Sequence, residues 1–381
     1  MARVTSLPCI VVGGGPAGAA CAIELARNGH RVTVVEKTRT AHHKVCGEFL
    51  SIEAQALIAY LGVDVGSLGA TEVHSFSLVC GGDFPIIELP FRAAGLSRFS
   101  LDEALLQAAA QAGAEVVRGV SVTGLAMKGT DSIAVRSPAE EFHAGGVVLA
   151  TGKHDLRGCG RPKGSVLAFK MQLRAAGAHA AKLRNLVHLS MFPGGYAGAC
   201  LVEGSVATIC WLIEQRLFNN IGVAWPAQAA HLARQSGFLS DLIAGAQPLW
   251  EKPVAIAAIP HSFMRQYPIS PLIYPVGDQL AVIPSYTGDG MSIALHSGIA
   301  AARAILDGTP AGEFQHSIVR GLRRQMLWAR AGNLLFGTSP AQAMTGAIAK
   351  AFPWAVPKLI TFIVNATRMR SFKLPPPIPR Q

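Results

Sequence analysis

The sequence predicts an α/β protein in which a parallel sheet is combined with an inserted antiparallel sheet and a helical C-terminal region. Three observations predict this fold class. An apolar strand, a glycine-rich turn and a helix open the chain, β-like segments alternate with helical segments through its middle, and residues 311–381 are largely helix-forming. With 381 residues, of which 50% are hydrophobic, the chain can form a large core and is too apolar to be disordered.

The first part of the chain predicts one strand–helix–strand unit. Cys9–Val12 is a short apolar run typical of a buried parallel strand. Ala19–Asn28 has a helix-forming composition, and Gly29 is suited to end that helix. Arg31–Val35 is rich in Val and Thr, which favours a second strand.

The next segments predict a second sheet and a return to the first. Loose alternation over residues 73–91 indicates strands of another sheet. Leu101–Ala112 has a helical pattern, with Ser100 as N-cap and Glu103 completing a capping box. Further strands are expected at Glu115–Arg118, Ile133–Val135 and Gly146–Ala150.

Beyond residue 163 the same alternation continues. We expect strands at Val166–Leu173, Val206–Ile213 and Leu280–Ile283, and helices at Ala227–Ala244 and Met291–Leu306. The sequence thereby divides into a parallel-sheet domain (1–72, 98–163 and 260–310), an inserted substrate domain (73–97 and 164–259) and a basic, apolar, helical region (311–381).

The turn after the first strand carries a dinucleotide-binding pattern. Gly13, Gly15 and Gly18 form G-x-G-x-x-G between a strand and a helix, and Glu36 ends the next strand. Gly13 permits the tight turn, Gly15 lets a pyrophosphate approach the backbone, and Gly18 lets helix and strand pack closely. The helix N-terminus offers N–H groups to phosphates. Glu36 is suited to accept hydrogen bonds from the ribose hydroxyls, but the spacing alone does not separate NAD from FAD.

Other segments resemble FAD-dependent proteins of the glutathione-reductase superfamily. Arg98 followed by Leu101-Asp102, the strand Val147–Gly152, and Val276–Asp278 with Thr287–Met291 match that family's segments in order. Lys44–Glu48 resembles the K-x-C-G segment of geranylgeranyl reductases and related flavin-dependent halogenases. Thr287–Gly298 resembles the reductase stretch T-G-E-G-I, with Asp289 and Met291 substituted. The W-x-W-x-I-P segment of tryptophan-type halogenases and the G-D-A-A-H segment of aromatic hydroxylases are absent.

The resemblance implies a Rossmann-like FAD-binding domain in a p-hydroxybenzoate-hydroxylase-like fold. Asp278 would hydrogen-bond a ribityl hydroxyl, and the N–H groups of Gly290 and Met291 would face the flavin O2 and N1 edge. The residues expected to contact FAD are Gly13, Gly15, Ala17, Gly18, Glu36, Lys37, Cys46, Gly47, Arg98, Val122, Gly152, Asp278, Gly288, Gly290 and Met291.

Cys46 and Glu48 are the predicted catalytic residues. The resemblance places Cys46 beside the isoalloxazine, where it would shape the substrate cavity or supply a proton, and Glu48 would donate or accept a proton. The alternatives are a small buried apolar side chain for Cys46, and a surface or ribose-contacting carboxylate for Glu48.

An FAD-dependent oxidoreductase is therefore predicted, and its activity is open among three possibilities. The main prediction is reduction of C=C bonds in a small hydrophobic isoprenoid- or polyketide-like substrate by hydride from reduced flavin N5, with NAD(P)H or a reduced redox protein as electron donor. The alternative is a monooxygenase or halogenase that acts through a C4a-(hydro)peroxide on an aromatic or polyketide substrate. A second alternative is a non-catalytic, membrane-associated FAD-binding protein.

Positive charge is concentrated at the C-terminal end. The net charge is +11, and residues 311–381 hold ten Lys or Arg against the single acid Glu313. This pattern predicts either a helical surface that binds an anionic membrane or a helical cap over the substrate cavity. Nucleic-acid binding is not expected, because no recognition motif accompanies the charge. The 7 cysteines contain no C-x-x-C pair, so no metal site is expected.

The location of the protein is predicted from the same sequence. No signal-peptide pattern is present at the N-terminus, and no apolar run reaches the length of a membrane span. We expect a cytoplasmic protein or one that is peripheral on the inner face of the membrane.

Overall fold

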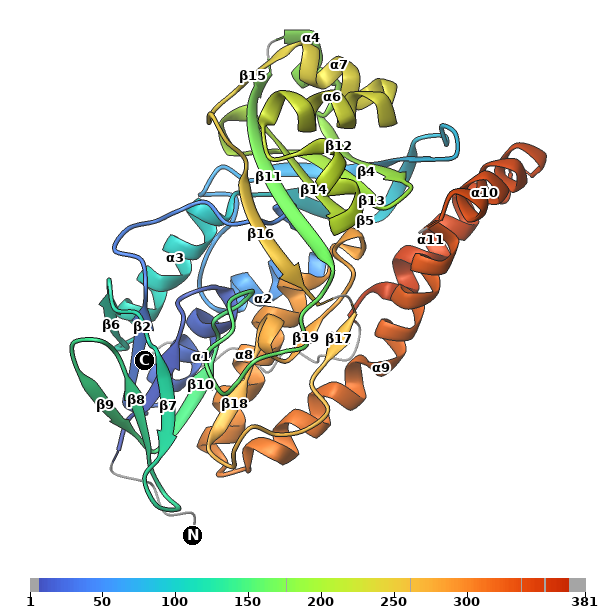
Figure 1. The fold of residues 1–381 in the computed structure, drawn as a ribbon. Helices are drawn as coiled ribbons and strands as arrows, with labels where there is room; N and C mark the ends of the chain where they lie inside the picture. Colours follow the sequence, from blue (N-terminus) through green and yellow to red (C-terminus); the bar gives the residue numbers. More distant parts are fainter. Residues whose placement is uncertain (1–6, 176, 261, 337, 353, 370–381) are drawn as a thin grey trace.

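Two large β-sheets dominate the structure, a computed structural model that describes residues 7–175, 177–260, 262–336, 338–352 and 354–369 (Figure 1). The first is a 5-stranded sheet in the order β18-β10-β1-β2-β6. The second has 9 strands, in the order β15-β11-β14-β13-β12-β4-β5-β3, with β16 paired to β11. The predicted fold class is confirmed by these two sheets and by the helices that close the described part of the chain.

The five-stranded sheet is parallel throughout. Val12 lies opposite both Val35 and Leu149, so the carboxyl ends of three neighbouring strands meet at one edge. In open parallel sheets, ligands bind at this edge. The strands are β1 (Cys9–Val12), β2 (Val32–Glu36), β6 (Glu115–Arg118), β10 (Gly146–Leu149) and β18 (Ile273–Pro275).

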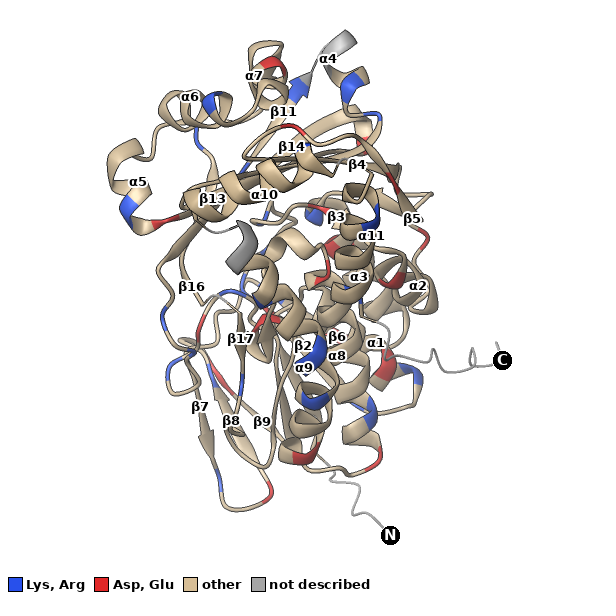
Figure 2. Ribbon diagram, turned by 90° about the vertical axis from the view of Figure 1, so that its right-hand side faces the viewer, with Lys and Arg blue, Asp and Glu red and all other residues tan. Residues whose placement is uncertain are grey.

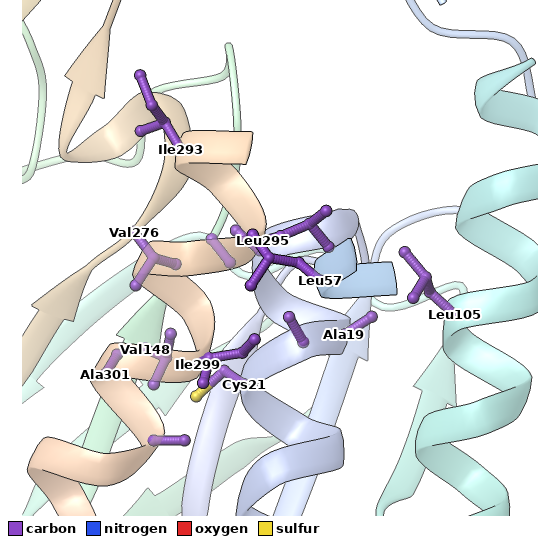
Figure 3. Packing of buried hydrophobic residues seen from close by; sticks show 14 of the residues in the cluster. Ala19, Cys21, Leu57, Leu105, Val148, Val276, Ile293, Leu295, Ile299 and Ala301 are labelled. Atoms are coloured by element: carbon purple, nitrogen blue, oxygen red, sulfur yellow. The ribbon is translucent and has the colours of Figure 1, made fainter. Parts of the chain in front are cut away.

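Five helices form a core with this sheet: α1 (Pro16–Arg27), α2 (Ile52–Tyr60), α3 (Arg98–Gln111), α8 (Gly290–Leu306) and α9 (Ala311–Phe336). Figure 3 shows apolar side chains of α1 and α8 meeting, with Cys21 close to Ile299. The two helices approach closely because Gly298 has no side chain, and a Cβ there would lie 2.1 Å from the carbonyl oxygen of Ala17. The close contact positions the two helix N-termini that the site uses.

The nine-stranded sheet carries a helical layer on one face, and its other face lines a cavity. Along β11, Leu167, Phe169 and Met171 pack with the helical layer, whereas Ala168 and Lys170 face the other side. This alternation is the period of two of a β-strand. The strands are β3 (Phe49–Leu50), β4 (Thr71–Cys80), β5 (Ile87–Gly95), β11 (Val166–Ala175), β12 (Asn185–Phe192), β13 (Gly195–Val202), β14 (Val206–Glu214), β15 (Ala246–Pro248) and β16 (Val254–Ile259), and the covering helices are α4 (Gly177–Lys182), α5 (Gln215–Ile221), α6 (Trp225–Gln235) and α7 (Gly237–Ala244).

Three helices end the described chain: α9 (Ala311–Phe336), α10 (Ser339–Ala351) and α11 (Val356–Thr367). Figure 1 shows them running from the parallel sheet to the antiparallel sheet, with α10 and α11 at the outer end. The smaller elements are β7 (Gly124–Met127), β8 (Ile133–Arg136) and β9 (Glu141–Ala144) in one sheet, β17 (Phe263–Met264) and β19 (Ala281–Val282) in another, and the short 3-10 helices η1 (Glu203–Ser205), η2 (Gly277–Gln279) and η3 (Ser285–Thr287).

Two helix predictions were wrong. The capping box at Ser100 and Glu103 does not form, because α3 starts three residues earlier and Ser97 is its N-cap. Glu103 instead binds Arg118, at 2.8 Å. The single helix expected over Ala227–Ala244 is broken, because extended backbone at Ser236 ends α6 and caps α7.

Candidate active site

The glycine turn and the start of α1 form one wall of a deep cavity. Gly13 has φ 105°, and a Cβ there would lie 2.5 Å from the carbonyl oxygen of Ala150. A Cβ on Gly18 would lie 2.0 Å from the carbonyl oxygen of Gly13. Both positions therefore require glycine, as the pattern predicts. Pro16 is the first residue of α1 and has no N–H to satisfy, so it suits a helix start that faces a ligand.

Glu36 is held at the end of β2 by the turn itself. One carboxylate oxygen accepts a hydrogen bond from the Gly14 N–H at 2.8 Å, and the other accepts from the Thr38 N–H at 3.0 Å and hydroxyl at 2.8 Å. Burial alone would raise the pKa of Glu36, but the charge of Lys44 and these hydrogen bonds lower it. The group is therefore an ionised acceptor beside the turn, as a ribose contact requires.

Cations surround the place where a diphosphate would lie. A Cβ on Gly15 would be 3.5 Å from the guanidinium of Arg98. Asp102 orients this guanidinium through bonds of 2.6 and 2.8 Å and also binds Lys44 at 2.9 Å. Burial would raise the pKa of Asp102, but Arg98 and Lys44 lower it. On the opposite side, Lys153 lies 3.3 Å from Asp278.

One continuous cavity of about 730 Å³ joins this cradle to the antiparallel sheet. Of the fifteen residues predicted to contact FAD, all except Gly18 line it; Gly18 acts as the close helix–strand contact. The lining predicted residues are Gly13, Gly15, Ala17, Glu36, Lys37, Cys46, Gly47, Arg98, Val122, Gly152, Asp278, Gly288, Gly290 and Met291. Segments far apart in the sequence are thus brought to one site.

The residues present fit FAD. The start of α1 and Arg98 suit a diphosphate, Glu36 suits a ribose, and Asp278 lies further along the same cavity. The start of α8, at Gly290, is a second helix N-terminus that lines the cavity. Its positive end would favour negative charge on a bound ring.

The antiparallel-sheet half of the cavity is a mostly apolar chamber. Its walls include the aromatic rings of Phe76, Phe91, Tyr196 and Tyr286. Burial raises the pKa of Tyr196 strongly, although contacts with Ser285 oppose the rise, so its hydroxyl stays protonated. The aliphatic lining residues are Leu78, Leu89, Val187, Leu189, Met191, Leu212, Val254, Ile256, Ile259, Val282, Ile360, Ile363 and Val364. Such a chamber excludes water and suits an apolar substrate.

Glu48 is buried next to Cys46 and Arg98 in the wall of the cavity. Its side chain is 0% exposed, and its carboxylate accepts from the ammonium of Lys170 at 2.6 Å, the amide of Gln172 at 3.0 Å and the Arg98 N–H at 2.9 Å. The surface alternative for Glu48 was therefore wrong. Its backbone has φ 59°, in the left-handed region. The turn thus directs this carboxylate inward, to β11.

Cys46 lines the cavity next to this ion pair. Its Sγ accepts a hydrogen bond from the Glu48 N–H at 3.4 Å and is partly exposed to the cavity. On the facing strands, Cys200 donates to the carbonyl oxygen of Gly47 at 3.4 Å. Burial raises the pKa of the Cys210 thiol to about 12, so it is a protonated, inert side chain. A chemical role for Cys46 stays a prediction.

A third group of polar residues lies where α8 begins. Asp289 accepts from the amide of Gln325 at 2.7 Å, and that amide also donates to the carbonyl oxygen of Thr367 at 2.6 Å. Burial raises the pKa of Asp289 to about 8, and the nearby charge of Glu53 adds to the rise. Arg368 binds Glu53 at 2.5 Å and lies over the ring of Phe91 at 4.3 Å. These contacts join the end of α11 to the cavity.

The sequence analysis missed four of these residues: Lys170, Gln172, Gln325 and Arg368. A signal existed for the first two, since Lys170 and Gln172 are the polar positions of the alternating strand Val166–Leu173. Gln325 lies within α9 and Arg368 directly follows α11, and the sequence pattern gives no indication of the partners of either.

Comparisons with known proteins agree with the assignment of a nucleotide-binding site around the glycine turn. Residues 7–158 match the family model of the pyridine nucleotide-disulphide oxidoreductases. Tryptophan 2-halogenase of Chondromyces crocatus is 24% identical, over 79% of this chain and 61% of that protein. Menaquinone reductase of Mycolicibacterium smegmatis is 31% identical, over 31% of this chain and 30% of that protein. The chain thus spans less than two thirds of the length of either relative.

Solved structures share the fold over nearly the whole chain. The flavin-dependent brominase Bmp2 superposes with a TM-score of 0.77 at 15% identity, covering 96% of both chains. Halogenase PltM, solved with phloroglucinol and FAD, superposes with a TM-score of 0.68 at 16% identity, covering 86% of this chain and 75% of that one. Residues 7–158 thus match an oxidoreductase family model that agrees with the FAD-binding site, and the chain as a whole has the fold of flavin-dependent halogenases.

Within the described ranges, no cluster of three or more His, Cys, Asp or Glu side chains is arranged to hold a metal ion. None of the helices in the described chain has both the length and the apolar character needed to cross a membrane.

Removal of the Glu36 carboxylate tests the nucleotide cradle. We expect Glu36→Leu to weaken FAD binding about 10- to 100-fold, because hydrogen bonds to a charged group contribute about 1.5–3 kcal/mol. Flavin absorbance after gel filtration and titration of apoprotein with FAD measure this. Glu140→Leu, at an exposed position, is the control. Equal FAD affinity in Glu36→Leu and wild type would refute the ribose contact.

Proposed function

We propose that this protein is an FAD-dependent, oxygen-dependent monooxygenase or halogenase that oxidises a ring-bearing, apolar substrate. The observation that carries the proposal is the single cavity that joins the flavin cradle to the apolar chamber. When bound there, FAD would supply two-electron chemistry with molecular oxygen. The residues of the chain bind and orient both partners and exclude water.

The extent of the similarity supports oxidation rather than C=C reduction. A match over 79% of the chain extends beyond the nucleotide-binding segments into the antiparallel sheet. The menaquinone reductase match covers only 31% of the chain. Because the chamber is built largely on that sheet, the longer match is the better guide to the reaction.

The surroundings of Glu48 also favour oxidation. Reduction of an isolated C=C bond by hydride requires a proton donor near the second carbon. Lys170, Gln172 and a backbone N–H all donate to Glu48, so both of its carboxylate oxygens are already engaged as acceptors. Cys46 remains the other candidate donor. Oxygen transfer to a ring places no such demand on this carboxylate.

Reduction remains the second candidate, for a specific reason. The menaquinone reductase similarity, at 31% identity, is higher than the halogenase similarity at 24%. The chamber is also apolar enough for an isoprenoid chain. In that case Cys46, and not Glu48, is the proton donor that we would expect.

Single-turnover experiments separate these activities. Enzyme reduced with dithionite is mixed with aromatic or isoprenoid substrates in three conditions: anaerobic, with oxygen, and with oxygen plus chloride or bromide. The proposal expects product only when oxygen is present, and mass spectrometry identifies oxygen or halogen in it. Product formed without oxygen, with loss of a C=C bond, would establish reduction instead.

A side chain placed in the chamber tests where substrate binds. Gly198 lines the cavity, and a Cβ there would meet its nearest atoms only at 3.7 Å. We expect Gly198→Leu to raise KM for large apolar substrates at least about tenfold, since it fills space that the substrate needs. FAD content should not change. Gly237→Leu, on the helical layer, is the control; the chamber assignment is wrong if both variants behave alike.

A further inference from the structure

The outer side of the C-terminal helices carries exposed apolar side chains in a regular arrangement. Met344, Ile348 and Phe352 are exposed at a spacing of four residues, which places them along one face of α10 and its end. Trp354 is 69% exposed and lies in the turn that follows. We call the whole set the outer strip: Met344, Ile348, Phe352, Trp354, Leu359 and Phe362.

Ring contacts make the outer strip continuous from α10 to α11. The rings of Phe352 and Trp354 meet edge to face at 6.5 Å. The ammonium of Lys358 lies 5.9 Å from the centre of the Trp354 ring. Phe362 packs edge to face on Trp328 at 5.2 Å. Large aromatic side chains left exposed together are uncommon on a surface that faces only water.

The charge of this region is of one sign. The sequence contains no Asp or Glu after Glu313. Lys358 is exposed and lies over the Trp354 ring of the outer strip, whereas Lys350 is exposed on the opposite face of α10, toward Gly82. Figure 2 shows further Lys and Arg along α9. Apolar side chains mixed with Lys and Arg match the boundary of an anionic lipid bilayer, where rings enter the headgroup region and ammonium groups meet phosphates.

Helix α11 has a second face that belongs to the cavity. Val356 and Ile360 are buried in the cluster that also contains Tyr196. Ile363 and Val364 line the cavity, whereas Leu359 and Phe362 of the same helix are exposed. One helix thus separates the outer strip from the apolar chamber.

We infer that the outer strip docks on an anionic lipid surface. No described helix is able to cross a bilayer, so the contact would be peripheral. Lipid docking does not depend on the proposed function. A consequence that does depend on it is that the apolar substrate would come from the lipid phase and reach the chamber beside α11.

Vesicle flotation of the FAD-loaded enzyme tests the inference. We expect binding to phosphatidylcholine vesicles that contain phosphatidylglycerol, weaker binding to phosphatidylcholine alone, and loss at high salt. The double variant Ile348→Ser with Phe352→Ser should weaken binding at least about tenfold, because it removes two exposed apolar side chains that the lipid would bury. Lys358→Glu should weaken it more than about fivefold on anionic vesicles.

The control removes exposed apolar side chains elsewhere. Val223 and Tyr267 are 68% and 82% exposed and lie outside the outer strip. The double variant Val223→Ser with Tyr267→Ser should bind vesicles like wild type. Flavin absorbance shows that each variant retains its fold. The inference fails if wild type does not float, if the control loses binding equally, or if light scattering shows a dimer that the outer-strip variant disrupts.

Discussion

Replacement of Lys170 with Met should lower the free energy of unfolding by about 3–5 kcal/mol, because it leaves the carboxylate of Glu48 buried without its counter-charge. Lys170 and Glu48 are both 0% exposed, and their charged atoms lie 2.6 Å apart. Gln172 and a backbone N–H remain as partners, but neither carries charge. Urea unfolding at neutral pH measures the loss.

A double-mutant cycle identifies the cause of this loss. Glu48→Gln combined with Lys170→Met removes both charges, so the double variant should be more stable than Lys170→Met alone. The matched control is Lys182→Met, which breaks an exposed ion pair with Asp241 and should cost less than about 1 kcal/mol. The interpretation is wrong if Lys170→Met costs no more than Lys182→Met.

The cycle also tests the link between the ion pair and the cofactor. Glu48 accepts from the Arg98 N–H, and the side chain of Arg98 lies at the glycine turn. A free carboxylate would shift this segment, so Lys170→Met should also retain less FAD. Restoration of flavin content in the double variant would show that charge balance, rather than Lys170 itself, holds the segment in place.

The nucleotide cradle could be predicted because its signals are local. Gly13, Gly18 and Glu36 lie within one strand–helix–strand unit, where spacing determines which atoms meet. The later segments were placed through family resemblance, and the structure brings them to the same cavity. Both kinds of signal depend on backbone geometry that short motifs specify well.

The buried ion pair could not be predicted, because its partners are 122 residues apart. No pattern around Glu48 in the sequence indicates a contact with Lys170, and glutamate side chains are usually exposed. The error at Ser100 has a related cause. Ser97 and Ser100 are both suitable caps, and the choice is set by Glu203, whose carboxylate binds the Ser97 N–H at 2.8 Å and the Ser100 hydroxyl at 2.6 Å.

Replacement of Asp289 with Asn should remove a large pH dependence of stability. Burial raises the pKa of Asp289 to about 8, above its ordinary value of 3.8. Between these values the folded protein keeps a proton that the unfolded chain releases, so stability falls as pH rises through this window. The slope approaches about 1.4 kcal/mol per pH unit. Below this window the contribution of Asp289 to the free energy of unfolding is at its maximum, and above about pH 8 it stops falling.

Urea unfolding of the flavin-free protein at several values between pH 5 and pH 9 checks this sign, with roughly 1.4 kcal/mol per unit expected between wild type and Asp289→Asn. The Gln325 amide opposes the rise in the pKa of Asp289. Gln325→Leu should therefore raise this pKa further, so that the free energy of unfolding stops falling only at a higher pH. A purely structural effect of either substitution would instead change the free energy of unfolding equally at every pH. Parallel curves for wild type and Asp289→Asn would mean that water reaches this carboxylate where the helix α8 begins, and that Asp289 is ionised beside the flavin at neutral pH.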